Sequence, residues 1–141
     1  YEDMLKYFDY KYKGRVSANI MFSNALSKKI YSGCDMLLMP SLFEPCGLSQ
    51  LIALRYGTIP IVRETGGLKD TVIPYNEFEM TGNGFSFANF NAHEMLGVIR
   101  YAIDIYNRPE HWKKIVENAM NSDYSFDKSA VEYIELYKGL E

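Results

Sequence analysis

The chain has 141 residues, of which 48% are hydrophobic and 23% are charged. This length suits one domain with a sizeable core, and the composition excludes a disordered chain. The formal net charge of −3 and the lack of a lysine or arginine run give no reason to expect a nucleic-acid partner. No apolar run approaches the roughly 20 residues of a membrane helix, and no segment resembles a signal peptide. We expect a cytoplasmic protein that binds neither nucleic acid nor a membrane.

Cysteine and histidine spacing argues against a metal site. Cys34 and Cys46 lack the spacing of metal ligands, and both histidines are far from them in sequence. We therefore predict no metal and no cofactor. We expect Cys34 to lie in the core. Cys46 has no histidine nearby that would activate it as a nucleophile, which favours contact with a ligand instead.

Helical and strand-like patterns alternate from the N-terminus. The chain opens within a helical pattern that Gly14 ends, and no strand precedes it, so we expect a truncated domain. Residues 16–21 are predicted to form a short buried strand. A helix capped by Ser23 or Asn24 follows and runs to residue 32.

Two strand–helix units occupy residues 36–72. Each has an apolar run, a glycine-containing loop and a helical pattern: 37–40, 41–49 and 50–56 in the first unit, and 59–62, 63–68 and 69–72 in the second. Pro60 conflicts with a strand interior because proline cannot donate to a ladder, but it is tolerated among the first residues of a strand.

We predict a loop at residues 73–82 and a short strand at 84–87. Three helices follow, at 92–106, 109–121 and 127–140. Strands separated by helices indicate an α/β fold, here a Rossmann-like parallel sheet with helices on both faces. We expect residues 1–141 to belong to one domain.

The two glycine-containing loops predict a phosphate site. A buried strand that enters a helix through such a loop aims free backbone N–H groups past the sheet edge, where they can bind phosphate. Two consecutive units of this kind could hold a diphosphate and the group attached to it. A diphosphate also needs cations, and only Arg55, Arg63 and Lys69 lie near the loops.

The first loop carries groups that suit a sugar. Glu44 follows a strand end, where ligands bind in open α/β sheets, and a carboxylate there suits sugar hydroxyls or a positive charge better than phosphate. Gly47 permits close approach of the backbone to a ligand, and Ser49 adds a hydroxyl. The alternative is that Glu44 and Ser49 only satisfy the N-terminus of the following helix.

Further candidates share this edge of the predicted sheet. Thr65, Gly66 and Gly67 precede a helix, although a glycine pair there is commonly only a turn. Phe22 follows a predicted strand end, where its ring could stack on a nucleotide base. The alternative for Phe22 is hydrophobic packing under the first helix.

Three segments are specific enough to indicate a family. They read SLFEPCGLSQL at 41–51, YGTIP at 56–60 and RETGGLKDTV at 63–72. These segments resemble bacterial glycogen synthase and plant starch synthase, and the resemblance continues to YIELY at 133–137. It implies the C-terminal, nucleotide-binding domain of a two-domain GT-B glycosyltransferase. Such an enzyme transfers glucose from ADP-glucose to the non-reducing end of an α-1,4-glucan with retention, in a cleft between two Rossmann-like domains.

The resemblance implies a role for each candidate residue. Glu44 would hold the glucose near the reacting carbon as the catalytic residue, with Cys46 close by. Phe22 would stack on adenine. The diphosphate and the sugar would contact the remaining candidates: Gly47, Leu48, Ser49, Thr65, Gly66 and Gly67.

The chain departs from the family pattern in two ways. Many relatives with this fold carry a second glutamate eight residues after the first; here that position is Ile52, as is normal for the glycogen and starch synthase branch. The basic residues that the family places against the diphosphate, and its N-terminal domain with the acceptor surface, are not in this chain. We therefore expect the isolated chain to be inactive. We also expect an exposed sheet edge, at which a homodimer could form.

Two alternatives remain open at this point. A non-catalytic nucleotide- or phosphate-binding module would use the same glycine loops. A glucosyltransferase that uses UDP-glucose would share the whole motif, because the motif does not fix the identity of the base.

Overall fold

The computed structural model describes residues 1–140, along which it places three strands and seven helices. The strands are β1 (Met36–Met39), β2 (Ile59–Arg63) and β3 (Phe85–Phe87). The helices are α1 (Glu2–Lys11), α2 (Asn24–Gly33), α3 (Ser49–Tyr56), α4 (Gly66–Thr71), α5 (Ala92–Tyr106), α6 (Pro109–Met120) and α7 (Phe126–Lys138). The predicted α/β order is confirmed from residue 23 onward.

The three strands form one parallel sheet in the order β1-β2-β3. Pro60 lies in the central strand, and the ladder explains why it is tolerated. Ile59 donates its N–H to Asp35 on the β1 side (2.9 Å), so the next nitrogen faces β3. Pairing with β3 begins only at Ile61 and Phe85, so Pro60 removes no hydrogen bond from the ladder.

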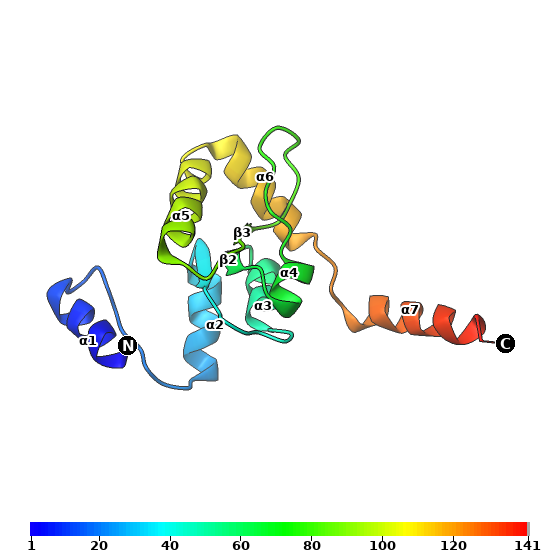
Figure 1. Cartoon of the computed structure of the whole chain (residues 1–141), viewed down its shortest axis with the longest axis horizontal. Helices are drawn as coiled ribbons and strands as arrows, with labels where there is room; N and C mark the ends of the chain where they lie inside the picture. Colours follow the sequence, from blue (N-terminus) through cyan, green and yellow to red (C-terminus); the bar gives the residue numbers. More distant parts are fainter. Residues whose placement is uncertain (141) are drawn as a thin grey trace.

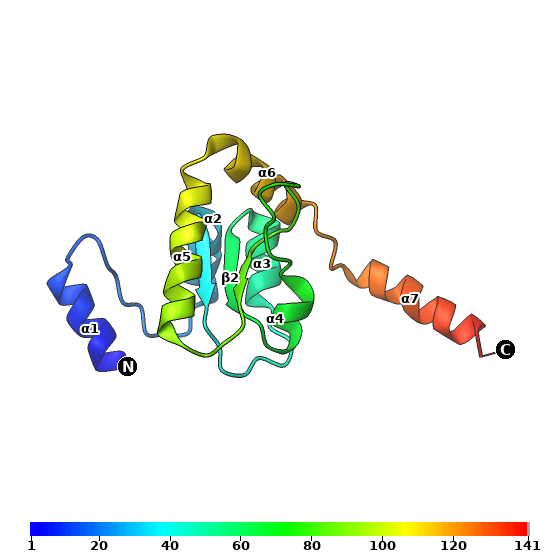
Figure 2. The same ribbon diagram turned by 45° about the horizontal axis from the view of Figure 1, so that its top comes forward.

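Helices cover both faces of the sheet, as predicted. Figure 2 shows α5 on one face and α2 with α3 on the other. Ile59 and Ile61 belong to the main core, whose other buried members are Leu54, Tyr75, Phe85, Ala102, Ile105, Ile115 and Ala119. Val62, on the opposite face, packs with Leu68 and Val72 of the α4 region. Because the strands are parallel, their ends, and the loops that follow them, lie at one edge of the sheet.

The predicted strand at residues 16–21 is wrong. Val16 forms only an isolated bridge with Lys13, and the segment that follows is coil. A strand needs a neighbour, and the outer side of β1 pairs with none of residues 1–140. β1 is therefore an edge strand, with Leu38 42% exposed. The homodimer expected at such an edge stays a prediction.

The first and last helices project from the body. Figure 1 shows α1 and α7 on opposite sides of it, and neither contains a buried residue. The prediction that Cys34 belongs to the core is also wrong. Cys34 ends α2, where its carbonyl accepts the Thr58 hydroxyl (2.8 Å) while its side chain is exposed. Within residues 1–140, no helix has both the length and the apolarity to cross a membrane.

A carboxylate stabilises the start of α5. Asn91 accepts the N–H of Glu94 (2.8 Å) through its side chain. The carboxylate of Glu94 in return accepts the N–H groups of Ala88 (2.8 Å) and Asn89 (3.0 Å). These hydrogen bonds, the one from Ala88 foremost, hold the pKa of Glu94 below its ordinary value of 4.5.

Replacing Glu94 with glutamine should therefore lower the Tm at pH 7 and change it little at acidic pH. Because the pKa is lower in the folded state, the ionised carboxylate contributes stability above its unfolded pKa, and this contribution disappears as the pH falls through the folded pKa. Thermal unfolding of both proteins at several pH values below 7 measures the difference. A Tm difference that stays constant down to pH 2 would contradict this account.

Candidate functional site

The loop after β1 and the turn after β2 meet at the edge where both strands end. The N–H of Gly67 donates to the carbonyl of Pro45 (3.1 Å), which joins the start of α4 to the loop before α3. Such an edge is where ligands bind in open parallel sheets. The structure therefore brings the two predicted glycine loops together.

The glycine pair makes this contact possible. A Cβ on Gly66 would collide with the backbone carbonyl of Glu44, and a Cβ on Gly67 would lie 2.8 Å from the Cα and carbonyl carbon of Cys46. Only glycine lets the two backbones approach this closely. The pair is therefore more than a turn, but its first task is packing, and the Gly67 N–H is already used by Pro45.

The N-terminus of α3 is open. Leu48 occupies the N-cap position and no side chain caps the helix, so the alternative that Glu44 and Ser49 serve as caps is wrong. Gly47 has φ 72°, a left-handed conformation that favours glycine and turns the chain into the helix. Within residues 1–140, the N–H groups of Leu48 and Ser49 find no acceptor, which leaves them available to an anion.

Three side chains of the same two loops are also available. The carboxylate of Glu44 is half-buried, and it forms no hydrogen bond or ion pair with the residues that the structure describes. Cys46 is an exposed free thiol. Thr65 occupies the N-cap position of α4 without a cap hydrogen bond from its side chain. A carboxylate, a thiol and a hydroxyl thus lie in the two loops that meet at this edge.

Phe22 lies apart from these groups, in the segment that leads into α2. Its side chain is 92% exposed, so the alternative of packing under a helix is wrong. Ser23 caps α2 by accepting the N–H of Leu26 (3.2 Å), which fixes where this segment ends. The stacking of Phe22 on a base stays a prediction.

Most of the cationic side chains near the glycine loops do not face the open amides or are already hydrogen-bonded. Arg63 donates to the carbonyls of Ser41 and Leu42, and so it holds the loop after β1 in place. Arg55 lies near the C-terminal end of α3, away from the open amides. Only Lys69 remains exposed near the glycine pair. The loops of this chain therefore supply little positive charge for a diphosphate.

The sequence did not predict the structural roles of two residues in this region, Gln50 and Arg63. Gln50 is fully buried in the first turn of α3, and its side-chain Nε2 donates to the carbonyls of Cys46 (3.0 Å) and Gly47 (2.8 Å). A polar residue on the buried side of a helix is a signal that the periodicity could have provided. Its partners across the turns could not be read from the sequence.

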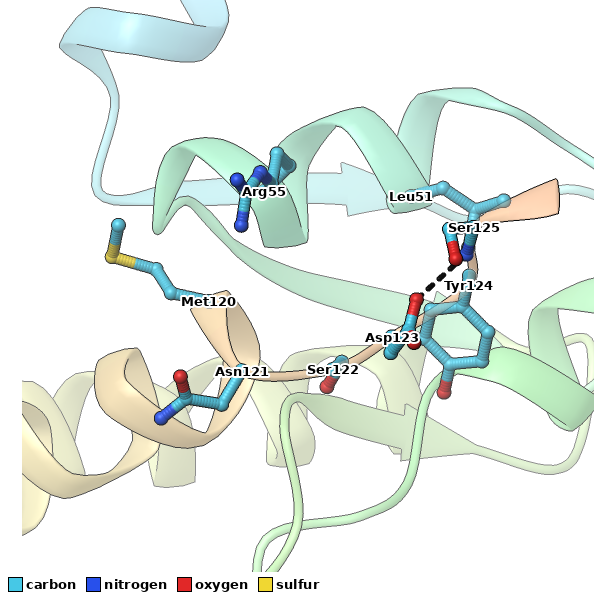
Figure 3. Close-up of a pocket in the computed structure, with 8 residues that line it drawn as sticks. All are labelled: Leu51, Arg55, Met120, Asn121, Ser122, Asp123, Tyr124 and Ser125. Carbon is cyan, nitrogen blue, oxygen red and sulfur yellow. Dashed lines mark hydrogen bonds between the residues drawn. The ribbon is translucent and has the colours of Figure 1, made fainter. Parts of the chain in front are cut away.

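A groove of about 510 Å³ lies along α3, and it contains none of the candidate residues. Figure 3 shows Leu51 and Arg55 of α3 on one side and the linker 120–125 on the other. One polar contact lies within the linker: Ser125 donates its N–H to Asp123 (2.9 Å), which lowers the pKa of that carboxyl. We therefore place the candidate site at the strand ends.

Comparison with known proteins gives a consistent result. The family profile described as "Glycosyl transferases group 1" matches residues 1–119. The chain is 63% identical over 141 residues to a glycogen synthase of Lachnospira eligens and 62% identical over 140 residues to one of Clostridium botulinum, covering 99% of this chain in both cases. It spans only 30% and 29% of the length of these relatives.

A solved structure agrees in fold as well as sequence. The catalytic domain of Starch Synthase IV from Arabidopsis thaliana, bound to ADP and acarbose, matches with a TM-score of 0.85 and 36% identity. The match covers 96% of this chain and 29% of that one.

Proposed function

Because the chain belongs to the group 1 glycosyl transferases, we propose that it is the nucleotide-sugar-binding part of a glycogen synthase. The whole enzyme would transfer glucose from ADP-glucose to the non-reducing end of an α-1,4-glucan, with retention of configuration. One observation carries the proposal: the unpartnered Glu44 carboxylate lies in the loop that leads into the open amides of Leu48 and Ser49, within a sequence that is 63% identical to a glycogen synthase.

The geometry suits separate contacts to the diphosphate and to the glucose of the donor. The amides of Gly47, Leu48 and Ser49 would receive the diphosphate, and they suit the negative charge that grows on it as the glycosidic bond breaks. Glu44 would accept hydrogen bonds from the glucose hydroxyls and stabilise positive charge near the reacting carbon. Cys46 would touch the sugar at the same end.

The other candidates complete the donor site. Thr65, Gly66 and Gly67 would line the side that carries the diphosphate and the sugar, with the hydroxyl of the half-buried Thr65 as the polar contact. Phe22 would stack on adenine; the Arabidopsis starch synthase was solved with ADP, which supports an adenine nucleotide. No metal or cofactor has a role in this scheme.

The remaining groups would come from the rest of the enzyme. Arg63 is used by loop carbonyls, so apart from Lys69 the cations that neutralise the diphosphate would come from other segments. The glucan acceptor would bind across a cleft of which this chain forms one wall. Two exposed free thiols suit the reducing cytoplasm, where we place the protein.

Transfer of labelled glucose to glycogen tests the proposal. We expect the whole enzyme to transfer glucose from ADP-glucose, and the 141-residue chain alone to be slower by orders of magnitude, because it lacks the basic residues that the family places against the departing diphosphate. Inactivity of the whole enzyme with any sugar nucleotide would favour the non-catalytic binding module. Faster transfer from UDP-glucose, with weaker inhibition by ADP than by UDP, would overturn the choice of donor.

A further inference from the structure

We propose that Gln50 is a positioning residue that sets the Glu44 loop against the glycine turn before α4. This inference rests on the proposed function, because it assigns Gln50 to the same donor site. Gln50 itself is fully buried, so it acts through the groups that it holds.

One side-chain amide joins three segments. Its Nε2 donates to the carbonyls of Cys46 (3.0 Å) and Gly47 (2.8 Å) in the loop, and it lies 3.2 Å from the hydroxyl oxygen of Thr71 in α4. The Thr71 hydroxyl donates to the carbonyl of Gly67 (2.6 Å). A continuous chain of hydrogen bonds therefore runs from the loop, through Gln50, to the glycine pair.

These partners fix the orientation of the amide. Cys46 and Gly47 offer carbonyl oxygens, and the Thr71 oxygen has its proton committed to Gly67, so all three require the NH₂ group of Gln50, whose two protons they share. The oxygen Oε1 is consequently left buried without a donor among the residues described. A side chain that served only packing would be apolar, because an unpartnered buried oxygen is unfavourable. The useful part of Gln50 is its donor group.

The loop is held on both sides of Glu44. Arg63 binds the carbonyls of Ser41 and Leu42 before it, and Gln50 binds those of Cys46 and Gly47 after it. Loss of the Gln50 donor frees the second side, next to the open α3 amides. A shift of about 1 Å in reacting groups can lower a rate about 100-fold.

The test compares Gln50→Met with Thr58→Val in the whole enzyme. Thr58 is a matched control because it is also buried and donates to two carbonyls, those of Tyr31 and Cys34, but at the opposite end of α3. We expect Gln50→Met to lower kcat at least 10-fold, with a smaller change in KM for ADP-glucose. Thr58→Val should lower the Tm but leave kcat within twofold of wild type.

Amide hydrogen exchange provides a readout that does not depend on activity. Exchange over residues 44–49 and 65–68 should become at least 10-fold faster in Gln50→Met and stay unchanged in Thr58→Val. If Gln50→Met does not fold, Thr71→Val breaks the same chain more mildly and should raise exchange over residues 65–68. If the wild-type enzyme is inactive, the proposed function is refuted. The hydrogen-exchange result alone then tests the positioning role of Gln50. Unchanged exchange, or equal losses of kcat in Gln50→Met and Thr58→Val, would overturn the positioning role.

Discussion

Replacing Glu44 with glutamine should lower kcat for glucose transfer by about 1,000-fold, the order of the loss seen when one charge-stabilising group leaves an active site. The change keeps the size of the side chain and removes the charge that would face the reacting carbon. Because the carboxylate forms no hydrogen bond or ion pair with residues 1–140, the Tm should stay close to that of wild type. Affinity for ADP should change only a few-fold, since ADP lacks the sugar. Steady-state kinetics and ADP titration calorimetry on the whole enzyme measure both quantities.

Glu64 gives a control for this substitution. It is the other glutamate at the same edge, and its carboxylate accepts the hydroxyl of Ser86 (2.7 Å). Glu64→Gln makes the same chemical change one residue before the glycine turn, and we expect kcat within about threefold of wild type, because a single hydrogen bond between side chains is affected. If kcat falls equally in Glu44→Gln and Glu64→Gln, then the total negative charge at this edge, and not Glu44 itself, supports glucose transfer.

Replacing Gly67 with alanine should have the second large effect, on stability and activity together. The added Cβ would lie 2.8 Å from two backbone atoms of Cys46, and backbone cannot move aside as a flexible side chain can. We expect a loss of about 1–3 kcal/mol in the free energy of unfolding, which is typical of overpacking. The displaced loop would carry Glu44 with it, so kcat should fall too. Urea unfolding and transfer kinetics measure the two effects.

Gly97 is the matched control. It lies within α5, and a Cβ there would meet nothing within 4 Å. Gly97→Ala should raise the free energy of unfolding by about 0.5–1 kcal/mol, because alanine favours a helix interior more than glycine does. If Gly67→Ala were as stable and active as Gly97→Ala, the close contact between the loop and the turn would be refuted.

Sequence patterns that span only a few residues predicted most helices and strands of this fold. Ser23 was one of two predicted caps for α2, and it accepts the N–H of Leu26 as a cap should. Gly57 ends α3 in a left-handed conformation, φ 76°, which local sequence also favours. The strand at 16–21 failed because a strand depends on a neighbour, which no local pattern reveals.

The site was predictable in outline and not in its contacts. The glycine loops and Glu44 could be placed at the strand ends, because a parallel sheet gathers those ends at one edge. The packing of Gly67 on Cys46, and the bonds from Arg63 to Ser41 and from Gln50 to Thr71, join residues about twenty positions apart. Such contacts depend on tertiary structure, so the sequence did not reveal the packing of Gly67 on the loop or the structural role of Arg63.

Amide hydrogen exchange of the whole enzyme with and without ADP tests the central claim, that the open N-terminus of α3 binds the donor diphosphate. We predict slower exchange at Leu48 and Ser49 when ADP is bound, because their free N–H groups would gain acceptors. The Gly67 N–H, already bonded to Pro45, should change much less. Unchanged exchange at Leu48 and Ser49 under saturating ADP, with protection elsewhere in the protein, would contradict the account.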